Sequence, residues 1–272
     1  MKWGNRGGCA LLVLVLIFSF WLVLEEGEAM SGIGYPDWGK IKKGVGVSPL
    51  ADLGELAARL GSINTFDRRG DTVWMDDFEH TLNKWEVVLF GTGAAGAVSN
   101  NAARNGEYSA ALTTGTGADP TVYLIHHFFV PVPGKVGVEF SFSSGSWPSY
   151  VNLFLDLYDG VYHWSPNFRY NKVNSKLQVQ DRTAGYVDVA TSLVLKADSY
   201  HFHTAKLVVD MATGDYVRLL LNGVEYDISA YAMPRISDTS TPEATVAVVP
   251  EGNGTNSRII YVDDVIITQN EP

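Results

Sequence analysis

Apolar and polar residues alternate along most of the chain after residue 73, with the period of two that is typical of β-strands. Valine and phenylalanine alternate with small or polar residues over 136–143, and valine and leucine do the same over 151–158. Turn sequences separate such runs, and Asn222-Gly223 between two apolar segments is typical of a β-hairpin. The pattern predicts an all-β fold, an antiparallel jelly-roll β-sandwich formed by residues 73–272.

The first and last runs of this pattern both carry acidic residues. Asp77 and Glu79 follow the opening run, and Asp263 and Asp264 lie within the closing one. If the two strands pair, these carboxylates come together, and hard oxygen ligands of this kind suit Ca²⁺. We therefore expect a calcium site at this seam, with ordinary solvated strand ends as the alternative.

The pattern is different before residue 73. Residues 30–72 begin as a Gly-rich, basic and aperiodic arm, until Ser48-Pro49 opens a short amphipathic segment that Gly61 ends. This predicts a short N-terminal helical extension. A helix of this length does not stand alone, so we expect it to pack on the sandwich or to mediate self-association.

Residues 1–29 resemble an export signal. The apolar run 10–24 follows two basic residues and precedes a small-x-small cleavage site, as in a signal peptide. Left uncleaved, it would be a signal anchor and the chain's contact with a membrane. This interpretation predicts an extracellular or cell-surface protein. In the alternative, the segment is an untranslated leader, translation starts at Met30, and the protein is cytoplasmic or virion-associated.

The charge of the chain argues against nucleic acid as a partner. The formal net charge is −10, and residues 71–272 hold 12 Lys and Arg against 23 Asp and Glu. A surface of this sign, without a basic stripe, repels phosphate backbones. The single cysteine, Cys9, leaves the sandwich with neither a disulfide nor a cysteine metal site.

Aromatic and planar polar residues concentrate between Trp147 and Arg182. A sugar ring stacks on an aromatic ring while its hydroxyls bond to planar polar groups, so this segment is a candidate glycan site. Several of its polar residues alternate with core leucines and valines and therefore share one face of the sheet. We expect ligand contacts from Asn152, Asp156, Tyr158, Tyr162, Trp164, Arg169, Gln178 and Gln180. The alternative is that many of these rings belong to the core.

Four segments carry a resemblance to a known family: Asp76–Glu79 with Trp85, Gly106–Leu112, the hairpin Leu207–Gly223, and Val262–Val265. Together they resemble the concanavalin A-like lectin and glucanase sandwiches, including laminin-G-like domains and jelly-roll carbohydrate-binding modules. The resemblance covers about residues 73–268. It implies extracellular sugar recognition, often with calcium, or in some members glycan cleavage.

Three classes of function follow. Glucanases of this fold carry a Glu-x-Asp-x-x-Glu run on one strand, and the sequence lacks it. A polysaccharide-degrading enzyme that uses His126, His127 or Asp156 is therefore the lesser alternative. The sequence favours a non-catalytic, carbohydrate-binding, lectin-like protein that is secreted or on the surface. The other alternative is a structural or assembly subunit, cell-surface or virion-type, that uses the sandwich as a scaffold.

Overall fold

The computed structural model describes residues 67, 69–128, 134–183 and 185–272. They belong to the second of two compact units of the chain, Asn64–Pro272. The predicted signal segment, arm and helix lie outside the described residues. The part described contains seventeen strands and no helix that could span a membrane.

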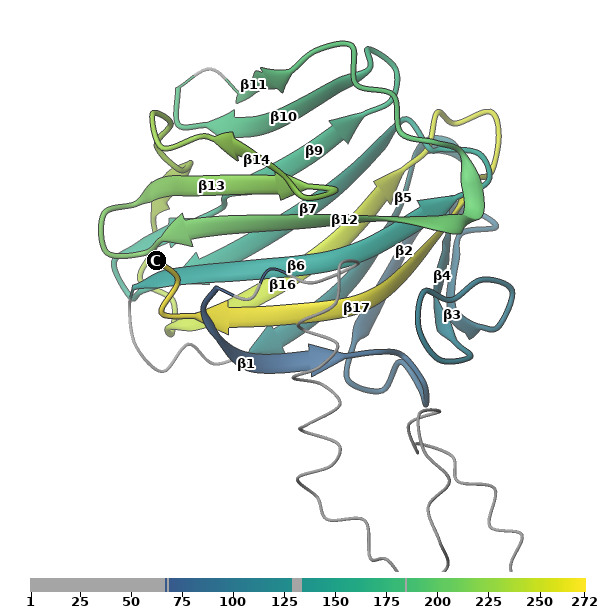
Figure 1. Ribbon diagram of the computed structural model, residues 1–272, viewed down its shortest axis with the longest axis horizontal. Helices are drawn as coiled ribbons and strands as arrows, with labels where there is room; N and C mark the ends of the chain where they lie inside the picture. Colours follow the sequence, from purple (N-terminus) through teal and green to yellow (C-terminus); the bar gives the residue numbers. More distant parts are fainter. Residues whose placement is uncertain (1–66, 68, 129–133, 184) are drawn as a thin grey trace, which may run out of the picture. The chain divides into compact units, whose positions relative to one another are not determined.

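Two antiparallel sheets form a sandwich, and Figure 1 shows the strands of one sheet lying across those of the other. We call them sheet A and sheet B. In order across sheet A the strands are β14 (Val224–Asp227), β13 (Asp215–Leu221), β12 (Asp198–Asp210), β6 (Lys135–Ser144), β17 (Ile259–Gln269), β4 (Ser109–Thr113) and β3 (Ala95–Ser99), and β1 (Asp71–Asp76) also pairs with β17. In order across sheet B they are β11 (Gly185–Ala190), β10 (Lys176–Asp181), β9 (Asn167–Asn171), β7 (Tyr150–Tyr158), β16 (Glu243–Glu251), β5 (Thr116–Phe128) and β2 (Glu86–Thr92). The short strands β8 (Tyr162–Trp164) and β15 (Arg235–Ser237) extend sheet B beside β7.

The first and last strands pair, as the sequence predicts. β1 runs antiparallel to β17, from Asp71 opposite Gln269 to Asp76 opposite Val265 (Figure 1). β17 pairs on its other side with β6, so this last strand lies in the interior of sheet A and not at its edge. β1 begins at Asp71, two residues before the boundary expected from the pattern.

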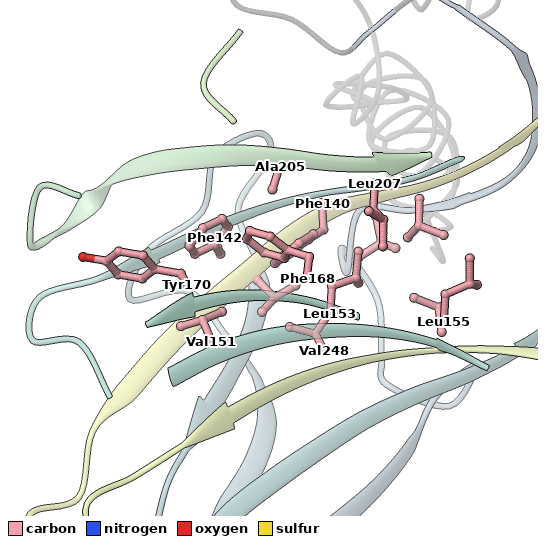
Figure 2. Packing of buried hydrophobic residues seen from close by; sticks show 14 of the residues in the cluster. Phe140, Phe142, Val151, Leu153, Leu155, Phe168, Tyr170, Ala205, Leu207 and Val248 are labelled. Carbon is pink, nitrogen blue, oxygen red and sulfur yellow. The ribbon is translucent and has the colours of Figure 1, made fainter. Parts of the chain in front are cut away.

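The core lies between the two sheets and is formed by the predicted alternating residues. Phe140 and Phe142 of β6 face Leu153 and Leu155 of β7 and Phe168 of β9, and all five side chains are fully buried (Figure 2). The rings of Phe140 and Phe142 stack with centroids 4.9 Å apart. Burying one such side chain stabilises the fold by about 1.5–3 kcal/mol. The all-β sandwich prediction is therefore confirmed.

The hairpin between β13 and β14 confirms the strongest turn prediction. Leu221 pairs with Val224, which leaves Asn222 and Gly223 as the two turn residues. Their φ angles are 52° and 78°, and positive φ at both positions is the geometry that Asn-Gly favours.

Candidate functional site

The outer face of sheet B carries a row of polar side chains that point away from the core. Arg169 of β9 lies directly between Asn152 of β7 and Gln178 of β10 in the strand register. Their strand neighbours Leu153, Phe168 and Val179 point the other way and are fully buried. Because side chains alternate between faces, the core pattern fixes these three polar groups on one surface.

Arg169 is the centre of this row. Its Nε donates to Asn152 Oδ1 at 2.6 Å, and its terminal nitrogen pairs with Glu251 Oε1 at 3.1 Å. The guanidinium carbon lies 4.3 Å from the ring centre of Tyr150 and 3.7 Å from that of Tyr186. We call these five residues, Tyr150, Asn152, Arg169, Tyr186 and Glu251, the Arg169 cluster.

Hydrogen bonds inside the cluster hold its polar groups in place. Asn152 Nδ2 donates to Glu251 Oε1 at 2.6 Å and to the Val249 carbonyl at 3.0 Å. Glu251 therefore accepts from both Asn152 and Arg169, and its charge balances that of the guanidinium. The arrangement gives two partly exposed tyrosine rings beside a rigid, electrically balanced planar group.

Burial raises the pKa of the Tyr186 hydroxyl to about 12. The Arg169 charge opposes this shift in pKa, and the Glu251 carboxylate adds to it. Burial, with a smaller contribution from Glu251, also raises the pKa of Tyr123 on β5. Both phenols are therefore neutral near pH 7 and available as hydrogen-bond donors.

Gln178 and Gln180 lie at the edge of the same face. Gln178 is buried, accepts from Asn171 Nδ2 at 3.0 Å and donates to Asp188 Oδ1 of β11 at 2.8 Å. Gln180 pairs with Tyr186 in the register between β10 and β11. Gln178 thus braces the edge strand that carries Tyr186.

Asp156 and Tyr158 lie further along β7, in a separate cluster with His163 and Ser165. The Asp156 carboxylate lies 3.0 Å from His163 Nε2 and accepts from Ser165 Oγ at 2.8 Å, and the Tyr158 ring stacks on His163 at 4.1 Å. Ser165 Oγ also lies 2.9 Å from the same His163 nitrogen. A Ser-His-Asp triad places its serine and its aspartate on opposite imidazole nitrogens, so this cluster does not form one.

Trp164 and Tyr162 face the core side instead. Trp164 pairs with Leu157 in the register, is 5% exposed and belongs to the hydrophobic core. Tyr162 packs against that core beneath Arg235, whose guanidinium lies 4.4 Å from its ring centre. The buried indole of Trp164 cannot act as a stacking platform, and neither ring joins the Arg169 cluster. The sequence could not show this, because β8 has three residues and too short a pattern to fix its faces.

The strands that carry the acidic residues pair, and the carboxylates bind the backbone of a nearby loop. Asp263 Oδ2 accepts from the Arg104 amide at 2.7 Å, and Glu79 Oε1 accepts from the Glu107 and Tyr108 amides at 2.8 and 2.9 Å. Two further contacts complete the seam: Asp264 accepts from Asn105 Nδ2 at 2.7 Å, and exposed Asp77 accepts from the Glu79 amide at 3.3 Å.

Burial raises the pKa of Asp263 to about 8, and the neighbouring Asp264 adds to the shift. Within the described ranges, no three histidine, cysteine, aspartate or glutamate side chains are grouped as metal ligands. Calcium at this seam stays a prediction.

Sequence reasoning missed three members of the Arg169 cluster: Tyr150, Tyr186 and Glu251. Glu251 is 82 residues from Arg169 in the chain, and the pairing of β16 with β7 brings them together. Tyr186 reaches the cluster through the pairing of β11 with β10. The sequence did indicate the position of Tyr150, since this residue continues the alternation that places Asn152 on the outer face.

Neither a protein-family model nor a curated protein matches the chain. Solved structures with a similar arrangement include a sialidase, at 10% identity and a TM-score of 0.48, over 74% of this chain and 19% of the sialidase. Another is a galectin-like protein of unknown function from Bacillus subtilis, at 11% identity and a TM-score of 0.47, over 74% and 97% of the two chains. A third is an alginate lyase from a Chlorella virus, at 8% identity and a TM-score of 0.48, over 73% and 100%. Likenesses this distant assign neither a ligand nor an activity to this chain.

Proposed function

We propose that the protein binds carbohydrate, without cleaving it, at the Arg169 cluster on the outer face of sheet B. The observation that carries the proposal is the contact of one guanidinium with two tyrosine rings while it donates hydrogen bonds to Asn152 and Glu251. Protein sites for sugars combine aromatic surface with planar polar groups, and the cluster offers both within a few ångströms.

The cluster is also pre-organised for binding. Arg169, Asn152 and Glu251 bond to one another, so their side chains are already ordered before a ligand arrives. Ordering long side chains is a main cost of binding, and that cost is met here by folding. The Tyr150 ring adds contact area at a small further cost in entropy.

Two features favour binding over turnover. Glycoside hydrolysis commonly needs two carboxyl groups facing the scissile bond, and the cluster contributes one, Glu251, which already accepts from Arg169 and Asn152. A general base works best with a pKa near the operating pH, and the pKa of Tyr186 is raised to about 12. The proposal retains the secreted or surface location predicted from residues 1–29.

A panel of neutral and acidic glycans tests the proposal, with binding measured by titration in calcium and again in chelator. We expect saturable binding that falls about tenfold in Tyr150→Ala, because loss of a ring contact is worth roughly 1.4 kcal/mol. Tyr200→Ala is the matched control, since Tyr200 is exposed on sheet A, and it should bind like the wild type.

No binding to any glycan in either buffer would contradict the proposal. Concentration-dependent self-association in its place would support the assembly subunit. Glycan binding that is lost in chelator would support a calcium ion near Asp77, Glu79, Asp263 and Asp264.

A further inference from the structure

The side chain of Asn167, at the start of β9, is buried without hydrogen bonds. It is fully buried, and neither its Nδ2 nor its Oδ1 has a partner among the described residues. Buried amides are nearly always bonded, because leaving a polar group both dry and unpaired is costly. An exception in a folded protein calls for an explanation.

Asn167 lies on the same face as the Arg169 cluster. It is two residues from Arg169 on β9, and it pairs with Phe154 of β7. Its side-chain amide contacts the Tyr186 hydroxyl closely enough to lower the pKa of that hydroxyl, although neither amide atom meets the geometry of a well-formed hydrogen bond. The unused amide therefore adjoins the proposed carbohydrate site.

The backbone of Asn167 is held firmly. Its amide nitrogen donates to the Tyr216 hydroxyl at 2.9 Å, and the same hydroxyl donates to the Gln180 carbonyl at 2.8 Å. Tyr216 is buried and reaches across from sheet A. The main chain at Asn167 is thus fixed, while its side-chain amide makes no well-formed hydrogen bond among the described residues.

Two other buried asparagines on this face provide a comparison. Asn152 bonds to Val249, Glu251 and Arg169, and Asn171 bonds to Gln178 and to the Asn174 amide. Both are satisfied within the protein. Asn167 differs from them in a way that local packing does not explain.

We infer that Asn167 is a specificity-determining residue, whose amide bonds to hydroxyl groups of the carbohydrate bound at the Arg169 cluster. The inference rests on the proposed function. An amide presents a donor and an acceptor side by side, and two adjacent sugar hydroxyls can meet both, since each hydroxyl can donate and accept. The ligand reaches the amide by displacing the Tyr186 side chain, which is carried on an edge strand that pairs with β10 alone.

The charge of the cluster indicates which sugars fit. Arg169 is already paired with Glu251, so it offers no uncompensated positive charge to a uronic or sialic acid carboxylate. A carboxylate placed there would also meet the negative charge of Glu251. The ligand class is therefore a neutral glycan with vicinal hydroxyls.

Asn167→Leu tests the inference, because leucine has nearly the shape of asparagine and no polar atoms. We expect affinity for the best neutral glycan of the panel to fall at least tenfold, while the midpoint of urea unfolding is unchanged or higher. Asn171→Leu is the matched control for stability. It breaks amide bonds that the protein does use, so its unfolding midpoint should fall.

The possible failures can be told apart. If the wild type binds no glycan, the proposed function is contradicted, and this inference, which rests on it, is contradicted as well. If the wild type binds and Asn167→Leu binds equally well, the inference alone is overturned. A lower unfolding midpoint for Asn167→Leu would show that its amide is satisfied within the folded protein and would also overturn it. Should that variant not fold, Asn167→Ala gives the binding comparison.

Discussion

Glu139 on β6 shows how strongly one position in a sheet can change the chemistry of a carboxyl. The side chain lies on the outer face of sheet A and is 2% exposed. Its Oε2 accepts from the Asp67 amide at 3.0 Å, and its Oε1 has no partner in the part of the chain described. Burial raises the pKa of Glu139 to about 7, against the opposing charge of Lys206.

This shift predicts a pH-dependent stability difference between the wild type and Glu139→Gln. Between about pH 4.5 and 7 the folded wild type keeps a proton on Glu139 that the unfolded chain has released, so the wild type should lose stability relative to the variant as pH rises through this window. Urea unfolding at several pH values measures the difference.

The prediction concerns the difference in stability between wild type and variant, because other groups titrate in the same pH range. Burial lowers the pKa of His126 and of His203, which makes stability rise with pH in this range, whereas the raised pKa of Asp263 makes it fall. All three groups are present in the wild type and in the variant, so their contributions cancel in the difference. Glu107→Gln, at an exposed position, should show the same pH dependence as the wild type. A pH-dependent difference from the wild type as large as that of Glu139→Gln would contradict the account.

Gly214 and Gly223 form a matched pair at the residue scale. Both have φ of +78°, but a Cβ on Gly214 would lie 2.2 Å from the Trp164 ring, whereas a Cβ on Gly223 would meet no atom within 4 Å. Gly223→Ala should cost about 1 kcal/mol for the backbone alone, and Gly214→Ala at least about 2 kcal/mol more because the buried indole must move. Equal unfolding midpoints for the two variants would contradict this packing.

At the scale of strands, the sequence predicted the local features well, but it did not predict which distant residues would meet. The alternation in β6 and β7 identified the core, and Asn222-Gly223 identified a hairpin. These signals are local, because period and turn chemistry are carried by neighbouring residues. The site depends on pairs far apart in the chain, such as Arg169 with Glu251, and strand order sets those.

The end of the chain after β17 is tied to sheet A by buried charges. Glu271 pairs with Lys206 at 2.6 Å and also with Arg218, and all three side chains are nearly inaccessible. Asp67, ahead of β1, contacts Lys206 at 3.1 Å and Arg218 at 3.7 Å. Two buried cations therefore share two carboxylates from the two ends of the sandwich sequence.

We expect Glu271→Gln to lower the free energy of unfolding by about 3–5 kcal/mol, because it leaves two buried cations with one carboxylate. Glu225→Gln is the control, since Glu225 pairs with Arg69 at the surface and its loss should cost about 1 kcal/mol or less. Denaturant unfolding measures both. Equal effects would show that the Glu271 pairs are screened by solvent.

At the scale of the whole sandwich, the two outer faces have different roles. The outer face of sheet A holds a buried ionic cluster that contributes to stability, whereas the outer face of sheet B holds partly exposed rings beside a paired guanidinium. Between them lies a continuous apolar core (Figure 2). The central claim is that carbohydrate binds to the sheet B face.

Backbone amide chemical shifts, recorded while the protein is titrated with the best glycan of the panel, test this claim most directly. The account predicts saturable shifts concentrated in β7, β9 and β10 and at Tyr186 of β11, with sheet A little changed. Saturable shifts confined to sheet A, or to the seam between β1 and β17, would place the ligand elsewhere and contradict the account.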